Sequence, residues 1–309
     1  MRRTRLLAGT LLTLPLLAPP PAAAAPAPAP DTSAQAPALS GSAPSGIRAK
    51  AAYLSAGGTT WGRGAEARRP IASITKLMTA FLVVRAGDLD RTITIKRKYR
   101  AYGARHDASM AGLHPGDRLT ARQLLYAMLL PSGSDAAFAL VESYGGTWPK
   151  FVAKMNAAAR SLGMADTRYD NFDGLPWPSG RADSSTPHDL VRLARAALAD
   201  PTLRRVVATR SYTLPRTRSH AAYTWHNTNH LLGTYQGTRG IKTGFTNAAG
   251  YCLLFTARRG DRTVYGVVLG EPTSAARFTD AARLLDWSFG HHPFDTATLR
   301  LRFATPDQD

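Results

Sequence analysis

The chain has 309 residues, of which 44% are hydrophobic and 19% charged, enough to bury one large core or two small ones. Its single cysteine, Cys252, excludes an intramolecular disulfide and lies in an apolar run that predicts a buried, inert thiol. The formal net charge of +18 favours a polyanionic partner. An equally good explanation is that the charge serves only solubility or reflects genome composition.

The first 24 residues predict a cleaved secretory signal peptide. Three arginines precede an apolar stretch at residues 6–18 and a run of alanines, so cleavage is expected after Ala24. The stretch is short for a membrane span, and Pro15 interrupts it. The Pro/Ala-rich residues 25–46 cannot bury a core and predict a disordered linker. We therefore expect an exported protein, extracellular or associated with the cell wall, that meets anionic wall polymer and not nucleic acid.

The folded domain is expected over residues 47–295, followed by a tail at 296–309. It opens with a hairpin whose strands, residues 47–56 and 59–64, flank a Gly-Gly turn. Apolar residues at helical spacing then predict five helices, over residues 72–87, 119–130, 134–146, 148–164 and 186–200.

Strands return near the C-terminus. Residues 250–270 predict two strands joined by a tight turn at Arg259–Gly260–Asp261, and residues 275–290 predict a closing helix. Strands at both ends of the domain and helices in the middle indicate an α/β fold. We expect one antiparallel sheet from both chain ends, flanked by helices, with an all-helical subdomain inserted at about residues 87–205.

Ser73 and Lys76 are the first candidate functional residues. Residues three apart on a helix lie on the same face, so the two side chains can touch. If Ser73 opens the helix, its backbone N–H lacks an intrahelical partner and can receive negative charge. Apolar neighbours should lower the pKa of Lys76, which makes it a base for a Ser73 nucleophile. The alternative is that Lys76 snorkels from the edge of a helix.

Two later segments add polar groups. Ser132 lies at the predicted break between two helices, where its hydroxyl can point into a cleft. Lys242, Thr243 and Gly244 lie on a predicted strand, where an amine and a hydroxyl can clamp a carboxylate. Gly244 is expected to leave room for a ligand against the backbone.

The three segments, in this order, resemble the active-site motifs of penicillin-binding proteins and serine β-lactamases. The resemblance is closer to the low-molecular-mass D-alanyl-D-alanine carboxypeptidases. The segments that resemble this family extend over residues 47–289 and include ASITKLMTA, PSGSDAA, FDGLP, STPHDLVRLA, NTNHLL and GIKTGFTNAAGYCLLFTARR.

The resemblance implies a serine peptidase mechanism without a cofactor. Ser73 would attack the carbonyl between the two terminal D-alanines of a peptidoglycan stem peptide, and Lys76 would take its proton. Ser132 would relay a proton to the leaving amine. Water would then release the acyl-enzyme, and β-lactam antibiotics such as penicillin would trap it.

The resemblance also implies the substrate-binding residues. The backbone N–H groups of Ser73 and Phe245 would form an oxyanion hole. Lys242 and Thr243 would hold the terminal carboxylate. The family usually has Asn where this chain has Ser134, and serine reaches less far and makes fewer hydrogen bonds. We therefore expect weakened activity or a changed substrate preference.

Three other functions are alternatives. A common β-lactamase needs a glutamate that activates water, and this chain has no glutamate between Ser143 and Gly270, which argues against that class. A catalytically weak protein that binds the cell wall would explain Ser134 and the positive charge. His226 and His230 are four residues apart, but a zinc site needs a third ligand and a helical context, and their neighbours predict a loop. Asp173 is expected in a turn near the cleft and not as a catalytic acid.

Overall fold

The computed structural model describes residues 44–290. The predicted signal peptide, residues 25–43 of the predicted linker and the predicted tail lie outside the described residues. Within the described range no helix combines the length and the apolar composition needed to cross a membrane.

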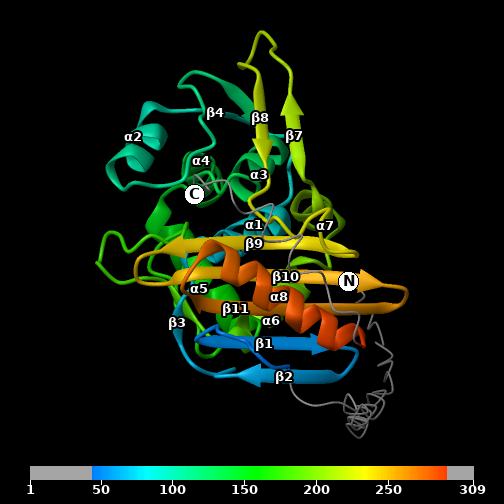
Figure 1. Ribbon diagram of the computed structural model, residues 1–309. Coiled ribbons are helices and arrows are strands. Elements are labelled where there is room, and N and C mark those ends of the chain that lie inside the picture. The colour runs from blue at the N-terminus through cyan, green and yellow to red at the C-terminus, as the bar shows by residue number, and fades with distance from the viewer. Residues whose placement is uncertain (1–43, 291–309) are drawn as a thin grey trace, which may run out of the picture. The chain divides into compact units, whose positions relative to one another are not determined.

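A five-stranded antiparallel sheet forms the centre of the described domain, in the order β2-β1-β11-β10-β9 (Figure 1). The N-terminal hairpin supplies β1 (Ala51–Ala56) and β2 (Thr59–Arg63). The other three strands come from the C-terminal part of the chain: β9 (Thr238–Thr246), β10 (Gly250–Arg259) and β11 (Arg262–Glu271). Strands β1 and β11 pair antiparallel, so the expected sheet from both chain ends is confirmed.

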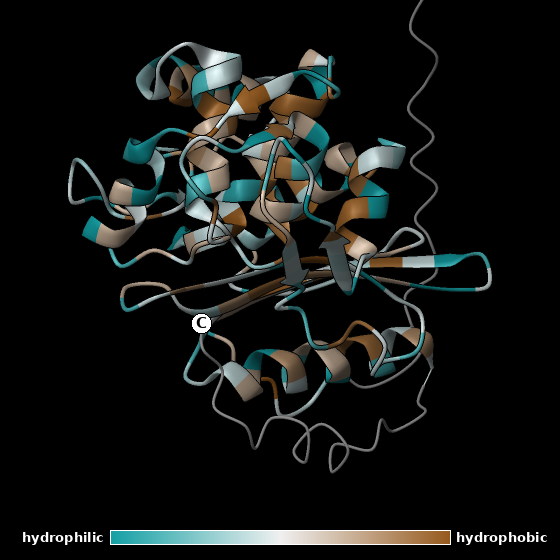
Figure 2. Ribbon diagram, turned by 90° about the horizontal axis from the view of Figure 1, so that it is seen from above, coloured by the Kyte–Doolittle hydropathy of each residue, from teal (hydrophilic) through white to brown (hydrophobic). Residues whose placement is uncertain are grey.

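Alternation along the strands divides the core into two layers. On β10, Leu253 packs in the cluster that includes α8 (Ser274–Phe289), and the neighbouring Leu254 packs with the other helices. Figure 2 shows α8 on one side of the sheet and the remaining helices on the other. Cys252 is fully buried on the side of the remaining helices, as its apolar run predicts.

The helices on that second face come from the middle of the chain. They are α1 (Lys76–Ala86), α2 (Arg97–Arg105), α3 (Ala121–Leu129), α4 (Ser134–Gly145), α5 (Trp148–Ser161), α6 (Pro187–Ala197) and α7 (Pro201–Ala208). Thr186 caps the start of α6, because its side chain accepts a hydrogen bond from the backbone N–H of Asp189.

Several short elements were not predicted. Strands of two to four residues are too short to show a periodicity, and the two missed helices span only nine and eight residues. They are α2, α7 and three paired ribbons: β3 (Arg69–Pro70) with β6 (Ser184–Ser185), β4 (Thr92–Thr94) with β5 (Arg118–Thr120), and β7 (Ser211–Leu214) with β8 (Tyr223–His226). The expected helix at residues 72–87 also differs at its start, where a 3-10 turn, η1 (Ala72–Thr75), precedes α1.

Candidate active site

Ser73 and Lys76 are in direct contact at the junction of η1 and α1. The Lys76 Nζ lies 2.9 Å from the Ser73 Oγ and donates a second hydrogen bond, 3.1 Å long, to the backbone carbonyl of Asp173. Lys76 is only 1% exposed, so the alternative of a snorkelling lysine is wrong. Ser73 is partly exposed although its neighbours in η1 are buried. A hydroxyl that solvent can reach is thus paired with an amine that water cannot reach.

Burial sets the protonation of Lys76. Removal from water lowers its pKa from the usual 10.5, and the carboxylates of Asp173, Asp135 and Asp183 oppose this effect in part. A lysine whose charged form is disfavoured can accept the proton of a neighbouring hydroxyl. The pair therefore has the chemistry of a nucleophile and its base.

Two glycines let other segments press against η1. A Cβ on Gly174 would lie 2.0 Å from the carbonyl oxygen of Ala72, and a Cβ on Gly244 would lie 2.9 Å from that of Ile71 and 3.1 Å from the Ser73 nitrogen. The expectation that Gly244 leaves room for a ligand is wrong, because the backbone of η1 occupies that space. The missing side chain instead brings strand β9 against the turn that carries Ser73.

The break between α3 and α4 brings two further hydroxyls into the interior. Ser132 and Ser134 are 6% and 1% exposed, and neither Oγ has a hydrogen-bond partner among the described residues. Ser132 has a φ of 68°, a left-handed backbone that is uncommon outside glycine and is found at functional sites. The Asp135 carboxylate fixes the start of α4, since it accepts backbone hydrogen bonds of 2.9 Å from Ala111 and 3.0 Å from Leu113.

Strand β9 carries the predicted carboxylate clamp. Lys242 and Thr243 are 1% and 4% exposed, and the Thr243 Oγ1 lies 2.6 Å from that of Thr228. Thr228 also donates its backbone N–H to the carbonyl of Leu130 at 3.2 Å. Thr228 thus ties β9 to the loop of Ser132, a role the sequence analysis missed because it depends on two contacts distant in sequence.

Phe245 follows the clamp on the same edge strand. Its side chain is 39% exposed, and its ring stacks on Tyr251 of β10 with centroids 4.3 Å apart. An edge strand pairs on one side only, so part of its backbone N–H groups point away from the sheet. The oxyanion role of Phe245 and the roles of the other site residues remain predictions.

The remaining candidates from the sequence are His226, His230, Cys252 and Asp173. His226 ends β8 and His230 lies in the following turn, and within residues 44–290 no group of His, Cys, Asp and Glu suits a metal ion. Burial raises the pKa of the Cys252 thiol to about 11, which leaves it unreactive. Asp173 lies in a buried bend, where its carbonyl accepts the hydrogen bond from Lys76 and its carboxylate favours the charged form of that lysine.

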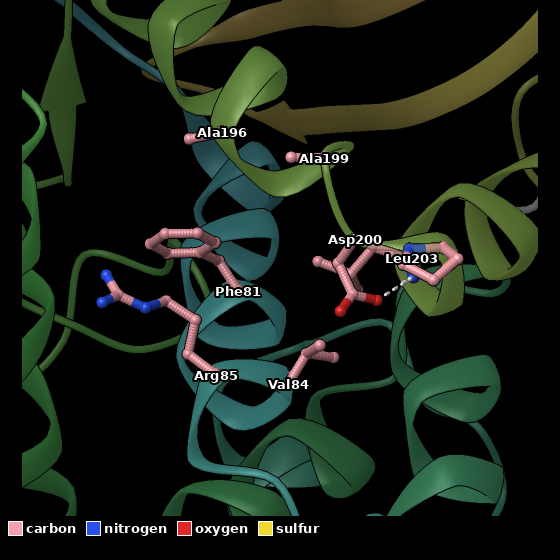
Figure 3. Close-up of a pocket in the computed structure, with 8 residues that line it drawn as sticks. Phe81, Val84, Arg85, Ala196, Ala199, Asp200 and Leu203 are labelled. Atoms are coloured by element: carbon pink, nitrogen blue, oxygen red, sulfur yellow. Dashed lines mark hydrogen bonds between the residues drawn. The ribbon is translucent and has the colours of Figure 1, made fainter.

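A hollow of about 420 Å³ lies along the far part of α1 (Figure 3). Phe81, Val84 and Arg85 line it from α1, and Leu203 lines it from α7. These α1 residues come two to three turns after Ser73, roughly 12–18 Å along the helix axis. The hollow is therefore separate from the Ser73 site.

The model of the D-alanyl-D-alanine carboxypeptidase family, peptidase S11, matches residues 43–273. The chain belongs to this family. It is 40% identical to the D-alanyl-D-alanine carboxypeptidase of Streptomyces sp. strain K15 over 245 residues, which are 75% of this chain and 83% of that protein. It is 36% identical to D-alanyl-D-alanine carboxypeptidase DacB2 of Mycobacterium tuberculosis over 248 residues, 78% of this chain and 81% of the relative.

Two solved structures with names typical of this family have a similar fold. The crystal structure of the Streptomyces K15 DD-transpeptidase superposes with a TM-score of 0.75 at 40% identity, covering 80% of this chain and 98% of the other. The D-alanyl-D-alanine carboxypeptidase of M. tuberculosis H37Rv superposes with a TM-score of 0.72 at 33% identity, covering 79% and 92%. The expected β-lactamase/transpeptidase-like fold is confirmed, and the chain is a serine peptidase of this carboxypeptidase family.

Proposed function

We propose that the protein removes the terminal D-alanine from peptidoglycan stem peptides through an acyl-enzyme on Ser73. The observation that carries the proposal is the 2.9 Å contact between the Ser73 Oγ and the buried Lys76 amine, whose pKa burial lowers. Membership of the carboxypeptidase family supports the choice of substrate.

In the acylation step, the Ser73 Oγ bonds to the carbonyl carbon between the two D-alanines, and Lys76 takes the hydroxyl proton. Negative charge then develops on the carbonyl oxygen, which the backbone N–H groups of Ser73 and Phe245 would receive. The carbon–nitrogen bond breaks, and the leaving amine gains a proton through Ser132.

The clamp on β9 would fix the substrate for this step. The amine of Lys242 and the hydroxyl of Thr243 would hold the terminal carboxylate of the substrate. The positive charge of Lys242 would pair with the negative charge of this carboxylate. In the second step water adds to the ester carbon, the bond to the Ser73 oxygen breaks as that oxygen regains a proton from the water, and the shortened peptide leaves with a new carboxyl group. A β-lactam would form the same ester with Ser73 and remain bound.

The test is release of D-alanine from diacetyl-Lys-D-Ala-D-Ala by the purified protein. Release is expected from the wild type and from Ser211→Ala at an exposed position of β7, and not from Ser73→Ala. Mass spectrometry after incubation with penicillin should locate the adduct on Ser73. An adduct elsewhere, or equal release by Ser73→Ala, would overturn the proposal.

Two further measurements separate related activities. A solved relative is a DD-transpeptidase, so glycylglycine is added as an acceptor, and the hydrolysed and transferred products are compared. We expect hydrolysis to dominate; a dominant transfer product would make the enzyme a transpeptidase. Slow turnover of nitrocefin with a long-lived adduct is expected, and fast turnover would indicate a β-lactamase.

We also propose export, on the composition of residues 1–24. Expression of the full chain in a bacterium should yield an extracellular or wall-bound protein that begins at Ala25. An intact N-terminus on an intracellular protein would contradict it. Binding to anionic wall polymer, suggested by the basic charge, is tested by sedimentation with purified cell walls before and after removal of their anionic polymers.

A further inference from the structure

Asp183 holds both ends of the turn that carries Ser73. It is fully buried at the start of the segment that pairs with β3. Its backbone carbonyl accepts a 3.1 Å hydrogen bond from the N–H of Ile71, and its Oδ2 accepts one of 2.7 Å from the Thr75 hydroxyl. Ile71 and Thr75 lie on either side of Ser73, so one residue restrains the nucleophile turn at two points.

The second carboxylate oxygen of Asp183 binds the segment that leads to Asp173. The Asp183 Oδ1 accepts backbone hydrogen bonds from Asp170 at 2.7 Å and from Asn171 at 2.8 Å. The same segment continues to Asp173, whose carbonyl accepts the hydrogen bond from Lys76. The carboxylate therefore bridges the segment that carries the nucleophile and the segment that orients its base.

Asp183 also acts on Lys76 through its charge. Burial disfavours the ammonium form of Lys76, and the carboxylates of Asp173, Asp135 and Asp183 favour it, with Asp183 the smallest effect of the three. The other titratable groups that face Asp183 are Asp173 and the phenols of Tyr102 and Tyr169. Burial raises the pKa of Asp183 to about 7, so its charge changes near neutral pH.

We propose that Asp183 is a positioning residue that aligns Ser73 with Lys76 and contributes to the pH at which Lys76 becomes a base. This inference rests on the proposed roles of Ser73 and Lys76. Asp183 should have two separable effects. Its hydrogen bonds to the segments of Ser73 and of Asp173 affect the rate of acylation, and its charge affects the pH profile.

The test measures the rate of acylation by a fluorescent penicillin from pH 5 to 10 in wild type and Asp183→Asn. The asparagine keeps the shape and lacks the charge, so the ammonium of Lys76 loses a stabilising partner and its pKa falls. The acid limb of the profile should therefore move to lower pH. The plateau rate should fall about tenfold, because the amide cannot accept all three hydrogen bonds.

Asp189→Asn is the matched control. Asp189 is 5% exposed and its Oδ2 accepts hydrogen bonds from the Asp166 N–H and the Thr167 hydroxyl, but it is not among the carboxylates that act on Lys76. Its loss should leave the acid limb in place. An unshifted limb in Asp183→Asn, or an equal shift in Asp189→Asn, overturns the proposal.

Thr75→Val serves if Asp183→Asn does not fold. It removes one hydroxyl and keeps the carboxylate, so the plateau rate should fall several-fold, and an unchanged plateau overturns the proposal. Labelling of the wild type shows whether the proposed function or only the role of Asp183 fails. If penicillin does not label Ser73, the proposed function and this inference fail together; if it labels Ser73 and the variants retain the wild-type profile, this inference alone fails.

Discussion

Gly174→Ala tests whether the close packing around Ser73 matters for activity. Gly174 has a φ of 95°, and a Cβ there would lie 2.0 Å from the carbonyl oxygen of Ala72 and 2.9 Å from the Ser73 nitrogen. The obstacle is backbone, which cannot rotate away as a side chain can, so the bend at Asp173 and the turn at Ser73 must move apart. We expect a loss of both stability and acylation.

The magnitude follows from two effects. A left-handed conformation costs alanine about 1–2 kcal/mol relative to glycine, and a forced overlap in a packed interior costs about 1–3 kcal/mol more. Gly180→Ala isolates the first effect, because Gly180 has a φ of 73° with nothing within 4 Å of a Cβ. The overlap alone should therefore lower the melting temperature of Gly174→Ala below that of Gly180→Ala by roughly 2–12 °C.

The assays are thermal unfolding and the second-order rate of labelling by a fluorescent penicillin. Gly180→Ala should acylate like the wild type, and Gly174→Ala should be at least tenfold slower, since separating Ser73 from Lys76 removes the base from the nucleophile. The reasoning is refuted if the two variants show equal melting temperatures and equal labelling rates.

Two predictions concern Lys76 and Ser134. Because burial lowers the pKa of Lys76, acylation should rise with pH and level off below pH 10.5. For the same reason the unfolding free energy should gain a contribution as the pH rises from the lowered pKa towards the ordinary lysine pKa, and an acid limb at the ordinary lysine pKa would contradict both. Ser134→Ala removes a buried hydroxyl without a partner among the described residues, so the unfolding free energy should stay within about 1 kcal/mol of wild type or increase. Turnover of the D-Ala-D-Ala peptide should nevertheless fall about tenfold, equivalent to about 1.4 kcal/mol; unchanged turnover would show that the Ser134 hydroxyl does not touch substrate.

Short-range features of this protein were determined by the sequence alone. The contact of Ser73 with Lys76 follows from a separation of three residues, which a 3-10 turn and an α-helix satisfy almost equally, so the different start of the helix did not affect it. The strands of the sheet and the cap at Thr186 likewise follow from local periodicity and local hydrogen bonding.

Only the tertiary structure decided how the segments are held together. The contacts of Asp183 with Thr75, of Thr228 with Thr243 and of Gly244 with the turn at Ser73 join residues that no periodicity relates. A glycine in a strand indicates a close approach but not which partner approaches, which is why Gly244 was assigned to a ligand. A buried carboxylate has no sequence signature at all, because its burial and its partners are set by the packing of segments about one hundred residues apart.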